Sequence, residues 1–266
     1  MAKDFYKNAR AYDIAFNDRE FDTECSFLEW ALTKHGKVKS KKNKNKSFIE
    51  LACGPARHAR EMVKRGWNTY ALDLSEEMVA YAAMEAEKEG LKITAIEADM
   101  TKFKLKKPVM IACTLMESIS HLVTNEQMIL HLKSVSKNLV SGGIYVIEMT
   151  HPMFYFPDDE ANTWITKEGD TSVEITFGIP SDTYNSVTQQ WMITTKMKIK
   201  EGKESPITFE SQSPIRWYLA QEMKALIELS GAFEKYWMYG SMYNIPGKEL
   251  DTSEDSDAMV IVLRKK

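Results

Sequence analysis

The seven residues Glu50–Ala56, ELACGPA, decide how the rest of the chain is interpreted. They end an apolar run that starts at Ser47, and Pro55 suits the first turn of a helix expected to reach about Lys64. Small residues at positions 52, 54 and 56 allow a ligand to lie against the backbone where a strand passes into a helix. Because ligands of open α/β sheets bind outside the carboxyl ends of strands, this loop predicts a binding site.

Two common nucleotide sites do not match the loop. A nicotinamide dinucleotide site requires G-x-G-x-x-G, whereas the corresponding positions here are Ala52, Gly54 and the bulky, charged Arg57. A phosphate-binding P-loop ends in Gly-Lys-Ser/Thr, and that ending is absent. The loop therefore favours a ligand other than a dinucleotide or a nucleoside triphosphate.

Outward from the loop, strands and helices alternate. The expected strands are 47–53, 68–74, 91–99, 107–115 and 144–149, the last after a helix break at Ser141-Gly142-Gly143. Ser75 suits the N-cap of a helix that ends near Gly90, and Thr124 with Gln127 forms a capping box. Strands and helices of this length predict a parallel sheet with helices on both faces.

The period changes to two after residue 151. Alternating apolar residues predict antiparallel strands at 173–179, 187–199 and 207–215, before a helix at 219–230 and strands at 233–239 and 257–265. The start of the chain, 4–34, is expected to be helical. We therefore predict an N-terminal helical cap (1–35), a Rossmann-like doubly wound core (36–151), an antiparallel β insertion (152–215) and the return of the core (216–266), with a seven-stranded, mostly parallel sheet.

Composition limits the class of protein. The 266 residues carry a net charge of −3 and are 44% hydrophobic, proportions of an ordinary globular enzyme with no electrostatic reason to bind nucleic acid. No stretch approaches the roughly 18 apolar residues of a membrane span. Cysteine and histidine spacing indicates neither a disulfide framework nor a metal site. We expect a cytoplasmic monomer or homodimer, and we interpret the lysine-rich stretch 36–47 as a solvated connector rather than a nucleic-acid arm.

Acidic residues close two successive strands. Asp73 ends the second expected strand, 23 positions after Glu50, where a carboxylate can bind both hydroxyls of a ribose. Asp99 ends the third strand and is followed by Met100. Either acid alone is more often a turn or cap residue, but a series of acids at successive strand ends favours a ligand.

With these segments the chain resembles the class I S-adenosylmethionine-dependent methyltransferases, in the small-molecule (sugar amine and glycine N-methyltransferase-like) subgroup. ELACGPARHA resembles their glycine-rich first motif, and ALDLSEEM, EADM, LMESISHL and KNLVSGGIYVIE resemble the segments at their next four strands. The resemblance covers Phe48 to Glu148. Pro55 and Ala56 stand where Thr and Gly are common, and a positive φ at Ala56 is expected to weaken cofactor binding.

The resemblance implies a role for each matching residue. Ala52 and Gly54 would pass close to the methionine part of the cofactor, with Glu50 near its ammonium group. Asp73 would accept from the ribose hydroxyls and Asp99 from the adenine amino group. The complete set of cofactor-binding residues so implied is Tyr12, Glu50, Ala52, Gly54, Arg57, His58, Asp73, Leu74, Met78, Asp99, Met100 and Leu115.

Two histidines are candidates for proton transfer on the acceptor side. His121 and His151 follow the fourth and fifth strands, at the sheet edge where an acceptor has to lie. Four further residues are candidates for acceptor binding: Tyr6, Tyr155, Arg216 and Trp217. Histidines bonded only to backbone, and a surface arginine, are the alternative interpretations.

The sequence thus predicts an S-adenosylmethionine-dependent methyltransferase that acts on a small molecule, most plausibly at nitrogen. One alternative is a non-catalytic, regulatory S-adenosylmethionine-binding protein. Others are methyl transfer to oxygen or to a protein.

Overall fold

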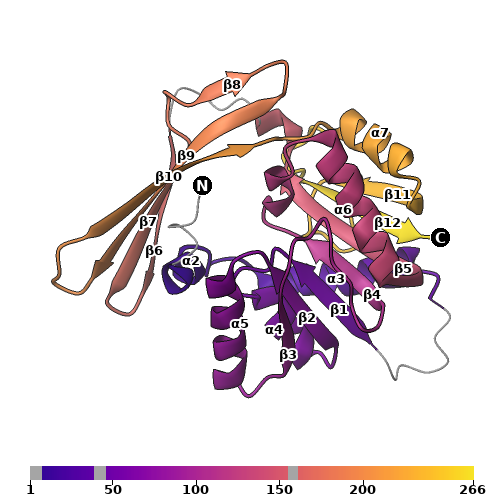
Figure 1. Ribbon diagram of the computed structural model, residues 1–266, viewed down its shortest axis with the longest axis horizontal. Coiled ribbons are helices and arrows are strands. Elements are labelled where there is room, and N and C mark those ends of the chain that lie inside the picture. Colours follow the sequence, from indigo (N-terminus) through magenta and orange to yellow (C-terminus); the bar gives the residue numbers. More distant parts are fainter. Residues whose placement is uncertain (1–7, 39–45, 155–160) are drawn as a thin grey trace.

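The computed structural model describes residues 8–38, 46–154 and 161–266. Their strands form two separate sheets, one of seven strands and one of five. The seven-stranded sheet is the centre of an α/β core, and the other sheet stands beside it, away from most of the helices (Figure 1).

The strand order of the large sheet is β11-β12-β5-β4-β1-β2-β3. The strands are β1 (Ser47–Leu51), β2 (Asn68–Asp73), β3 (Ile93–Glu97), β4 (Val109–Thr114), β5 (Leu139–Thr150), β11 (Phe233–Tyr239) and β12 (Ala258–Lys265). The first five are parallel, whereas β12 is antiparallel to both β5 and β11. The chain moves outward from β1 through β2 to β3 and then returns to β4, so β1 and β4 flank the topological switch point of the sheet.

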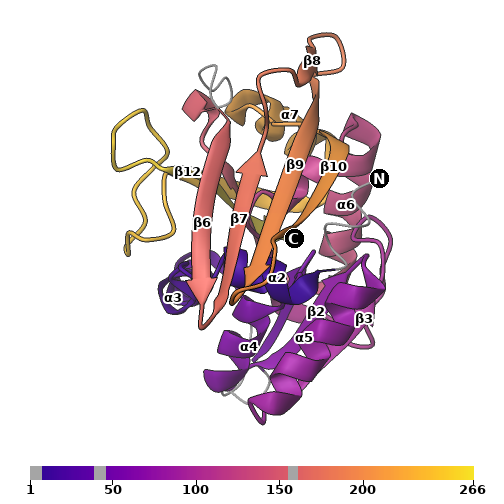
Figure 2. The ribbon, with the colours of Figure 1, turned by 90° about the vertical axis from the view of Figure 1, so that its left-hand side faces the viewer.

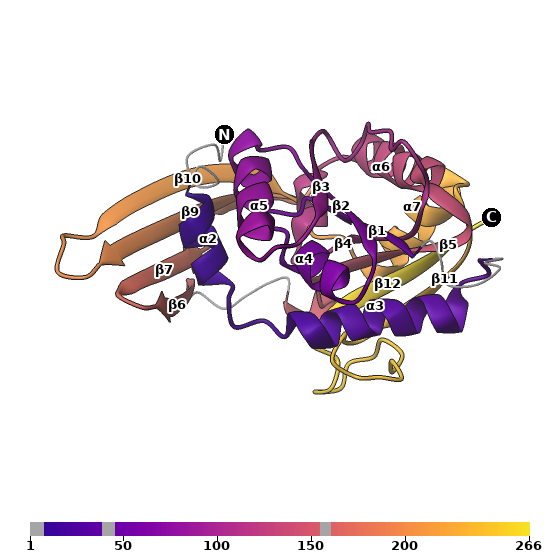
Figure 3. The same cartoon turned by 90° about the horizontal axis from the view of Figure 1, so that it is seen from below.

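Helices cover both faces of this sheet. Buried side chains of α3 (Phe21–His35), α4 (Arg57–Lys64) and α5 (Glu76–Lys88) join one core cluster. Those of α6 (Asn125–Asn138) and α7 (Ala220–Ser230) join the other. Figure 3 shows α3 and α6 on opposite sides of the strands. This arrangement confirms the predicted Rossmann-like, doubly wound class with an antiparallel insertion after the fifth strand.

The second sheet has the order β10-β9-β7-β6, and β8 pairs with β9. Its strands are β6 (Asn162–Glu168), β7 (Thr171–Phe177), β8 (Thr183–Asn185), β9 (Gln190–Glu201) and β10 (Ile207–Ile215), all antiparallel. The short helix α2 (Ala9–Ala15) packs on β6 and β7 (Figure 2). The short helical turns η1 (Ser118–His121) and η2 (Pro152–Phe154) follow β4 and β5.

The prediction of one N-terminal helix over 4–34 is wrong in its middle. The described part contains two helices, α2 and α3, separated by residues 16–20. The break lets α2 leave the main sheet, because the indole of Trp164 and the hydroxyl of Thr166 on β6 both donate to the carbonyl oxygen of Ala15. This carbonyl, in the last turn of the helix, is among those that have no partner within α2.

The prediction that Ser141-Gly142-Gly143 ends a helix is also wrong. The helix ends at Asn138, and β5 runs straight through the glycines. Gly142 has φ +74°, and a Cβ there would lie 2.5 Å from the backbone of Lys37, whose N–H donates to the carbonyl of Gly142. The glycines therefore give room to a crossing chain segment instead of stopping the helix.

The insertion has more strands than the three predicted. β6 and β8 were not expected, and the predicted strand 187–199 begins only at Gln190. Val187 is 90% exposed in the turn between β8 and β9, where Asn185 Oδ1 accepts from the N–H groups of Val187 and Thr188. An Asn side chain that bonds backbone two or three residues ahead turns the chain in this way.

A buried polar chain crosses the core beneath α6. Tyr145 on β5 is fully buried, and its hydroxyl oxygen lies 2.7 Å from Thr114 Oγ1 and 2.6 Å from His131 Nε2. His131 Nδ1 in turn lies 2.9 Å from the carbonyl oxygen of Met100. Burial lowers the pKa of His131 to about 4, so its ring is neutral at neutral pH.

Replacing Tyr145 with Phe is expected to lower the free energy of unfolding by about 1–3 kcal/mol, because His131 and Thr114 then lose a buried partner. Urea denaturation at pH 7 measures this. The matched control is Tyr70→Phe on β2, since Tyr70 is half-buried and no hydrogen bond of its hydroxyl is found in the described residues. Equal losses in the two variants would contradict the assigned role of the Tyr145 hydroxyl.

Candidate functional site

A small cavity lies at the switch point of the large sheet. The space between its walls is about 430 Å³, open solvent included, and the walls come from the loop after β1, the start of α4, the turn after β4 and the N-terminal helices. Seven residues predicted to bind cofactor line it: Tyr12, Glu50, Ala52, Gly54, Arg57, His58 and Leu115. The structure therefore brings together residues that the sequence separates by up to 103 positions (115 − 12).

The loop after β1 has an unusual backbone. Ala52, Gly54 and Ala56 all have positive φ, at 50°, 48° and 58°, a region that glycine adopts easily and alanine does not. Ala56 thus has the positive φ for which weaker cofactor binding was expected. Gly54 also sits under the ring of Tyr12, which a Cβ would meet at 3.5 Å.

Asp73 lies directly beside this loop. Its Oδ2 accepts from the N–H of Gly54 at 2.8 Å, and its Oδ1 accepts from the N–H of Ser75 at 3.0 Å. Burial raises the pKa of the Asp73 carboxyl, although these backbone N–H groups oppose the shift. The carboxylate at the end of β2 is thus tied to the glycine of the first loop.

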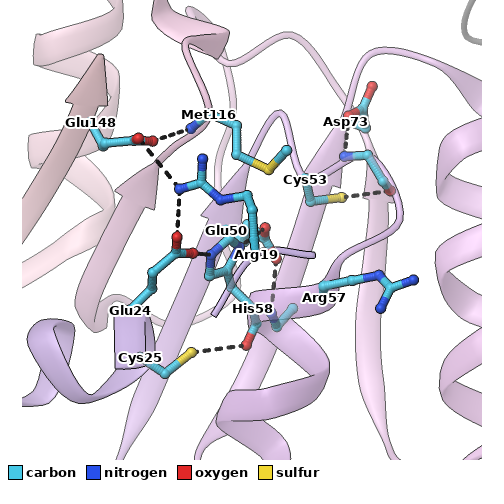
Figure 4. A network of polar contacts seen from close by, with 12 residues as sticks. Arg19, Glu24, Cys25, Glu50, Cys53, Arg57, His58, Asp73, Met116 and Glu148 are labelled. Carbon is cyan, nitrogen blue, oxygen red and sulfur yellow. Dashed lines mark hydrogen bonds and ion pairs between the residues drawn. The ribbon is translucent and has the colours of Figure 1, made fainter. Parts of the chain in front are cut away.

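The floor of the cavity is a buried ion network (Figure 4). The ring of His58 on α4 lies between two carboxylates, with Nε2 2.5 Å from Glu24 Oε2 and Nδ1 2.9 Å from Glu50 Oε1. Arg19 extends the network, because its guanidinium is 2.6 Å from Glu24 Oε1 and 3.3 Å from Glu148 Oε1. Glu148 Oε2 accepts from the N–H of Met116 at 2.5 Å.

The charges in this network follow from its geometry. Burial opposes protonation of His58, but the charge of Glu50 and the hydrogen bond with Glu24 outweigh it and raise the pKa of His58 to about 9. Burial also opposes ionisation of Glu24, yet His58 and Arg19 lower the pKa of Glu24 to about 2. His58 is therefore a buried imidazolium between carboxylates. Glu50, which also accepts from the N–H of Ala59 at 2.8 Å, has its oxygens engaged within the protein.

Aromatic residues of the N-terminal helices close the cavity. The rings of Tyr12 on α2 and Phe16 just after it are tilted, with centroids 4.7 Å apart, and Phe21 at the start of α3 contacts the ring of His58 edge-on at 4.9 Å. Asp13 holds α2 in place, since it forms an ion pair with Arg57 and accepts from the hydroxyl of Tyr81 at 3.1 Å. Arg57 thus makes an ion pair with α2 at the position where a dinucleotide site has glycine.

The other residues predicted to bind cofactor do not line the cavity. Leu74 is 72% exposed after β2, and Asp99 is exposed and accepts from the N–H and hydroxyl of Thr101 at 2.7 Å each. Met100 is half-buried against the core. Met78 is fully buried and has no exposed surface that a ligand could touch. The structure therefore does not support the prediction that it packs on adenine.

The two candidate histidines on the acceptor side differ in their surroundings. His121 ends η1 and reaches solvent, and partial desolvation lowers the pKa of its ring, so it is neutral at neutral pH. His151 is buried, with Nε2 2.8 Å from the carbonyl oxygen of Asp251 and Nδ1 accepting from the N–H of Met153 at 3.2 Å. Because both its nitrogens bond to backbone, His151 has no nitrogen left to act as a base.

Arg216 is likewise used within the protein. It is buried, donates to Asn125 Oδ1 at 3.0 Å and to Gln189 Oε1 at 2.8 Å, and forms an ion pair with Glu222. These contacts fasten the end of β10 to α6 and α7, so the predicted pairing of Arg216 with an acceptor has no support. Trp217 is half-buried, 5.8 Å from the ring of Trp191. Tyr6, Tyr155 and positions 39–45 of the lysine-rich stretch lie outside the described residues.

Sequence reasoning missed five charged residues of this region: Asp13, Arg19, Glu24, Glu117 and Glu148. Arg19 and Glu24 are ordinary helix-flanking residues in sequence, and no spacing links them to Glu50 or Glu148. Glu117 and Glu148 lie within segments that were recognised, directly after and inside expected strands. Their position at strand ends was the available signal, as it was for Asp73.

Three further features concern the described residues. No three His, Cys, Asp or Glu side chains there lie together as a group able to hold a metal ion. Cys25, Cys53 and Cys113 are free thiols in buried positions. No helix of the described part is long and apolar enough to cross a lipid bilayer.

Comparison with known proteins identifies the core. Residues 48–143 match the family model described as a methyltransferase domain. Residues 48–143 form a methyltransferase domain. The matched segment includes β1 to β4, the loop after β1 and the turn after β4, and therefore most of the cavity wall. The predicted class I S-adenosylmethionine-dependent methyltransferase core is confirmed for this segment.

The chain also matches individual proteins in sequence. The dTDP-3-amino-3,4,6-trideoxy-alpha-D-glucopyranose N,N-dimethyltransferase of Streptomyces venezuelae is 27% identical over 161 residues, 60% of this chain and 63% of that protein. The matches span less than two thirds of the curated relatives' length.

Solved structures extend the likeness of fold to almost the whole chain. An S-adenosylmethionine-dependent methyltransferase from Clostridium acetobutylicum has a TM-score of 0.75 at 15% identity and is covered over 98% of both chains. DesVI of Streptomyces venezuelae has a TM-score of 0.72 at 19% identity, with 97% of this chain and 98% of that chain covered.

Replacing His58 with Gln is expected to lower the free energy of unfolding at pH 7 by about 3–5 kcal/mol, because Glu24 and Glu50 remain buried without the imidazolium. The pKa of His58 is raised in the folded state, so its contribution is complete below pH 6.5 and disappears as the pH rises through about 9. The stability difference between the wild type and the variant should therefore shrink over that range.

Urea denaturation at pH 6.5, 8 and 9.5 measures the effect of His58→Gln. His121→Gln is the matched control, since His121 is exposed and a surface substitution changes stability by about 0.5 kcal/mol or less. A difference that stays constant or grows with pH would show that His58 is not the imidazolium of this network.

Proposed function

We propose that this methyltransferase transfers the methyl group of S-adenosylmethionine to an amino nitrogen of a small-molecule acceptor, of the amino sugar type. The observation that carries the proposal is the cavity at the switch point, which is built from the loop after β1 and the turn after β4 of a methyltransferase domain, with the acid at the end of β2 bonded to that loop. The sequence relative that is named as a sugar amine N,N-dimethyltransferase supports the nitrogen acceptor.

The residues present fit the cofactor. Gly54 has no side chain where its backbone faces the ring of Tyr12, and Asp73 adjoins it with a carboxylate that can accept from donor hydroxyls. Ala52, Gly54 and Leu115 would hold the methionine end, Asp73 the ribose, and Leu74 and Asp99 the purine edge. When bound, the cofactor supplies an electrophilic methyl group on a sulfonium.

The chain's own contribution to the reaction is positioning and exclusion of water. Tyr12, Phe16 and Phe21 close the cavity, and Arg57 and Tyr81 fix α2 through Asp13. Holding two reactants in the attack geometry accelerates a transfer by a large factor without any charged catalyst. We assign the second sheet, 162–215, to acceptor choice, since it follows β5 in the chain and is joined to the core by α2 and Arg216.

An amine needs only to lose a proton before it attacks. His121 is the candidate for receiving that proton, because its ring is neutral, reaches solvent and follows β4 at the carboxyl edge. His151 cannot share this role, since both its ring nitrogens are bonded to backbone.

We infer a cytoplasmic enzyme that acts as a monomer or homodimer.

The decisive assay supplies S-adenosylmethionine with an amino sugar nucleotide and with its hydroxyl isostere. Formation of S-adenosylhomocysteine and of a methylated amine, followed by mass spectrometry, is the expected result. Turnover of the hydroxyl compound alone would assign the enzyme to oxygen acceptors. Cofactor binding without turnover of either compound, or of a wider amine panel, would favour the regulatory alternative.

Replacing Asp73 with Ala is expected to weaken S-adenosylmethionine binding by about 2–4 kcal/mol, because one or two charge-assisted hydrogen bonds are lost. Isothermal titration calorimetry measures the affinity directly. Asp170→Ala is the control, since Asp170 is exposed in the turn between β6 and β7. Unchanged affinity in a folded Asp73→Ala variant would refute the assignment of Asp73 to the cofactor.

Replacing His121 with Gln is expected to lower kcat by up to about 10²-fold, at unchanged affinity for S-adenosylmethionine. The pH–rate profile should lose the limb that reports the histidine, while activity persists because positioning is intact. Complete loss of turnover at every pH in a folded variant would instead show an obligatory base. A profile identical to that of the wild type would remove His121 from the mechanism.

A further inference from the structure

Four glutamates lie at or beneath the carboxyl edge of β1, β4 and β5, and three of them have cationic partners. Glu24 pairs with His58 and Arg19, Glu50 with His58, and Glu148 with Arg19. The fourth, Glu117, has no cationic partner among the described residues, although it is half-buried. Every glutamate of this group except Glu117 thus contacts a cation.

The backbone holds Glu117 in a defined place. It stands in the turn between β4 and η1, and both Met116 and Glu117 have positive φ, at 55° and 60°. The Glu117 carboxylate accepts from the N–H of Thr150, the last residue of β5. The side chain therefore bridges the ends of two neighbouring parallel strands.

The turn separates the Glu117 side chain from the cofactor cavity. Met116 and Ser118, its two neighbours in sequence, line that cavity, whereas Glu117 does not. Its contact with Thr150 instead holds the carboxylate at the end of β5, and η1, which ends at His121, also packs against β5. The carboxylate therefore lies beside the cavity, at the sheet edge to which the proposed function assigns the acceptor.

We propose that Glu117 binds the acceptor as its ammonium ion and so selects amines over isosteric neutral acceptors. This inference rests on the proposed function, and it adds the charge state in which the acceptor is recognised. A half-buried carboxylate that lacks a cation lowers its energy when a cation binds beside it. An ammonium ion suits a single carboxylate with one backbone contact, whereas a hard metal ion requires several oxygen ligands.

The ionisation of Glu117 agrees with this assignment. Burial raises the pKa of its carboxyl to about 7 against the hydrogen bonds from Thr150, and the charge of Glu148 adds to the shift. The surrounding segments carry Arg19 before α3, Glu148 and His151 on and after β5, His121 on η1 and Arg216 just after β10. Arg19 and Arg216 are held by other side chains, so an acceptor ammonium is the cation available to Glu117.

The test compares the binding of an amine acceptor with that of its hydroxyl isostere by calorimetry, in the presence of S-adenosylhomocysteine. The variant is Glu117→Gln, which keeps an oxygen to accept from Thr150, and Glu117→Asp is the conservative variant. Glu126→Gln is the matched control, because Glu126 is exposed in the first turn of α6.

In the wild type the amine should bind more tightly than the alcohol. Glu117→Gln should weaken amine binding and raise KM for the amine by about 10- to 100-fold, with a smaller effect on kcat and none on S-adenosylmethionine affinity. Alcohol binding should change by about twofold or less. Glu117→Asp should recover part of the preference, and Glu126→Gln should behave as the wild type.

The pH dependence gives a second readout. An ammonium ion binds the ionised carboxylate, so amine affinity should rise as the pH increases through about 7 in the wild type and not in Glu117→Gln.

Equal weakening of amine and alcohol, or an unchanged amine preference in Glu117→Gln, would overturn the inference even if the wild type methylates amines. Failure of the wild type to methylate any amine would instead count against the proposed function. The preference for binding the amine over the alcohol is measured without turnover, so the two failures can be distinguished.

Discussion

The site depends on one buried imidazolium. His58 on α4 lies between Glu24 of α3 and Glu50 of β1, and its charge is what allows two carboxylates to remain under the cavity floor. Glu50 and His58 are also the two ends of the loop that carries Ala52, Gly54 and Ala56. The strained, positive-φ backbone of that loop persists because its ends are joined by an ion pair.

The same network connects the proposed cofactor cavity with the proposed acceptor edge. Arg19 links Glu24 to Glu148 at the end of β5, and Glu148 holds the N–H of Met116 in the turn after β4. This turn presents Met116 to the cavity, and Glu117 next to it faces the end of β5. A shift of the N-terminal segment would therefore act on both reactants.

The two sheets differ in construction and in what they contribute to the site. The parallel sheet supplies strand ends whose loops converge on the switch point, as expected for an open α/β sheet. The antiparallel sheet has no such convergence, and it is joined to the core through α2, whose last-turn carbonyl at Ala15 accepts from Trp164 and Thr166. Its separate construction is compatible with acceptor choice that varies while the cofactor region stays the same.

Local sequence was sufficient for most elements of the core. The capping box of Thr124 and Gln127, the N-cap at Ser75 and the helix end at Gly231 are all present, because caps involve residues within one turn of each other. The change of period after residue 151 located the second sheet, although β6 was missed. The acid at the end of β2 was found by the same kind of argument.

The sequence by itself determined the order of strands and helices in the parallel core, the loop after β1 and the resemblance to a methyltransferase family. Only the tertiary structure decided which charges meet, because His58 and Glu24 are 34 positions apart and Glu148 and Arg19 are 129 positions apart. It also showed that Gly142 makes room for Lys37, and that His151 and Arg216 are occupied within the protein. Backbone period depends on neighbouring residues, whereas ion pairs and close backbone contacts depend on segments that folding brings together.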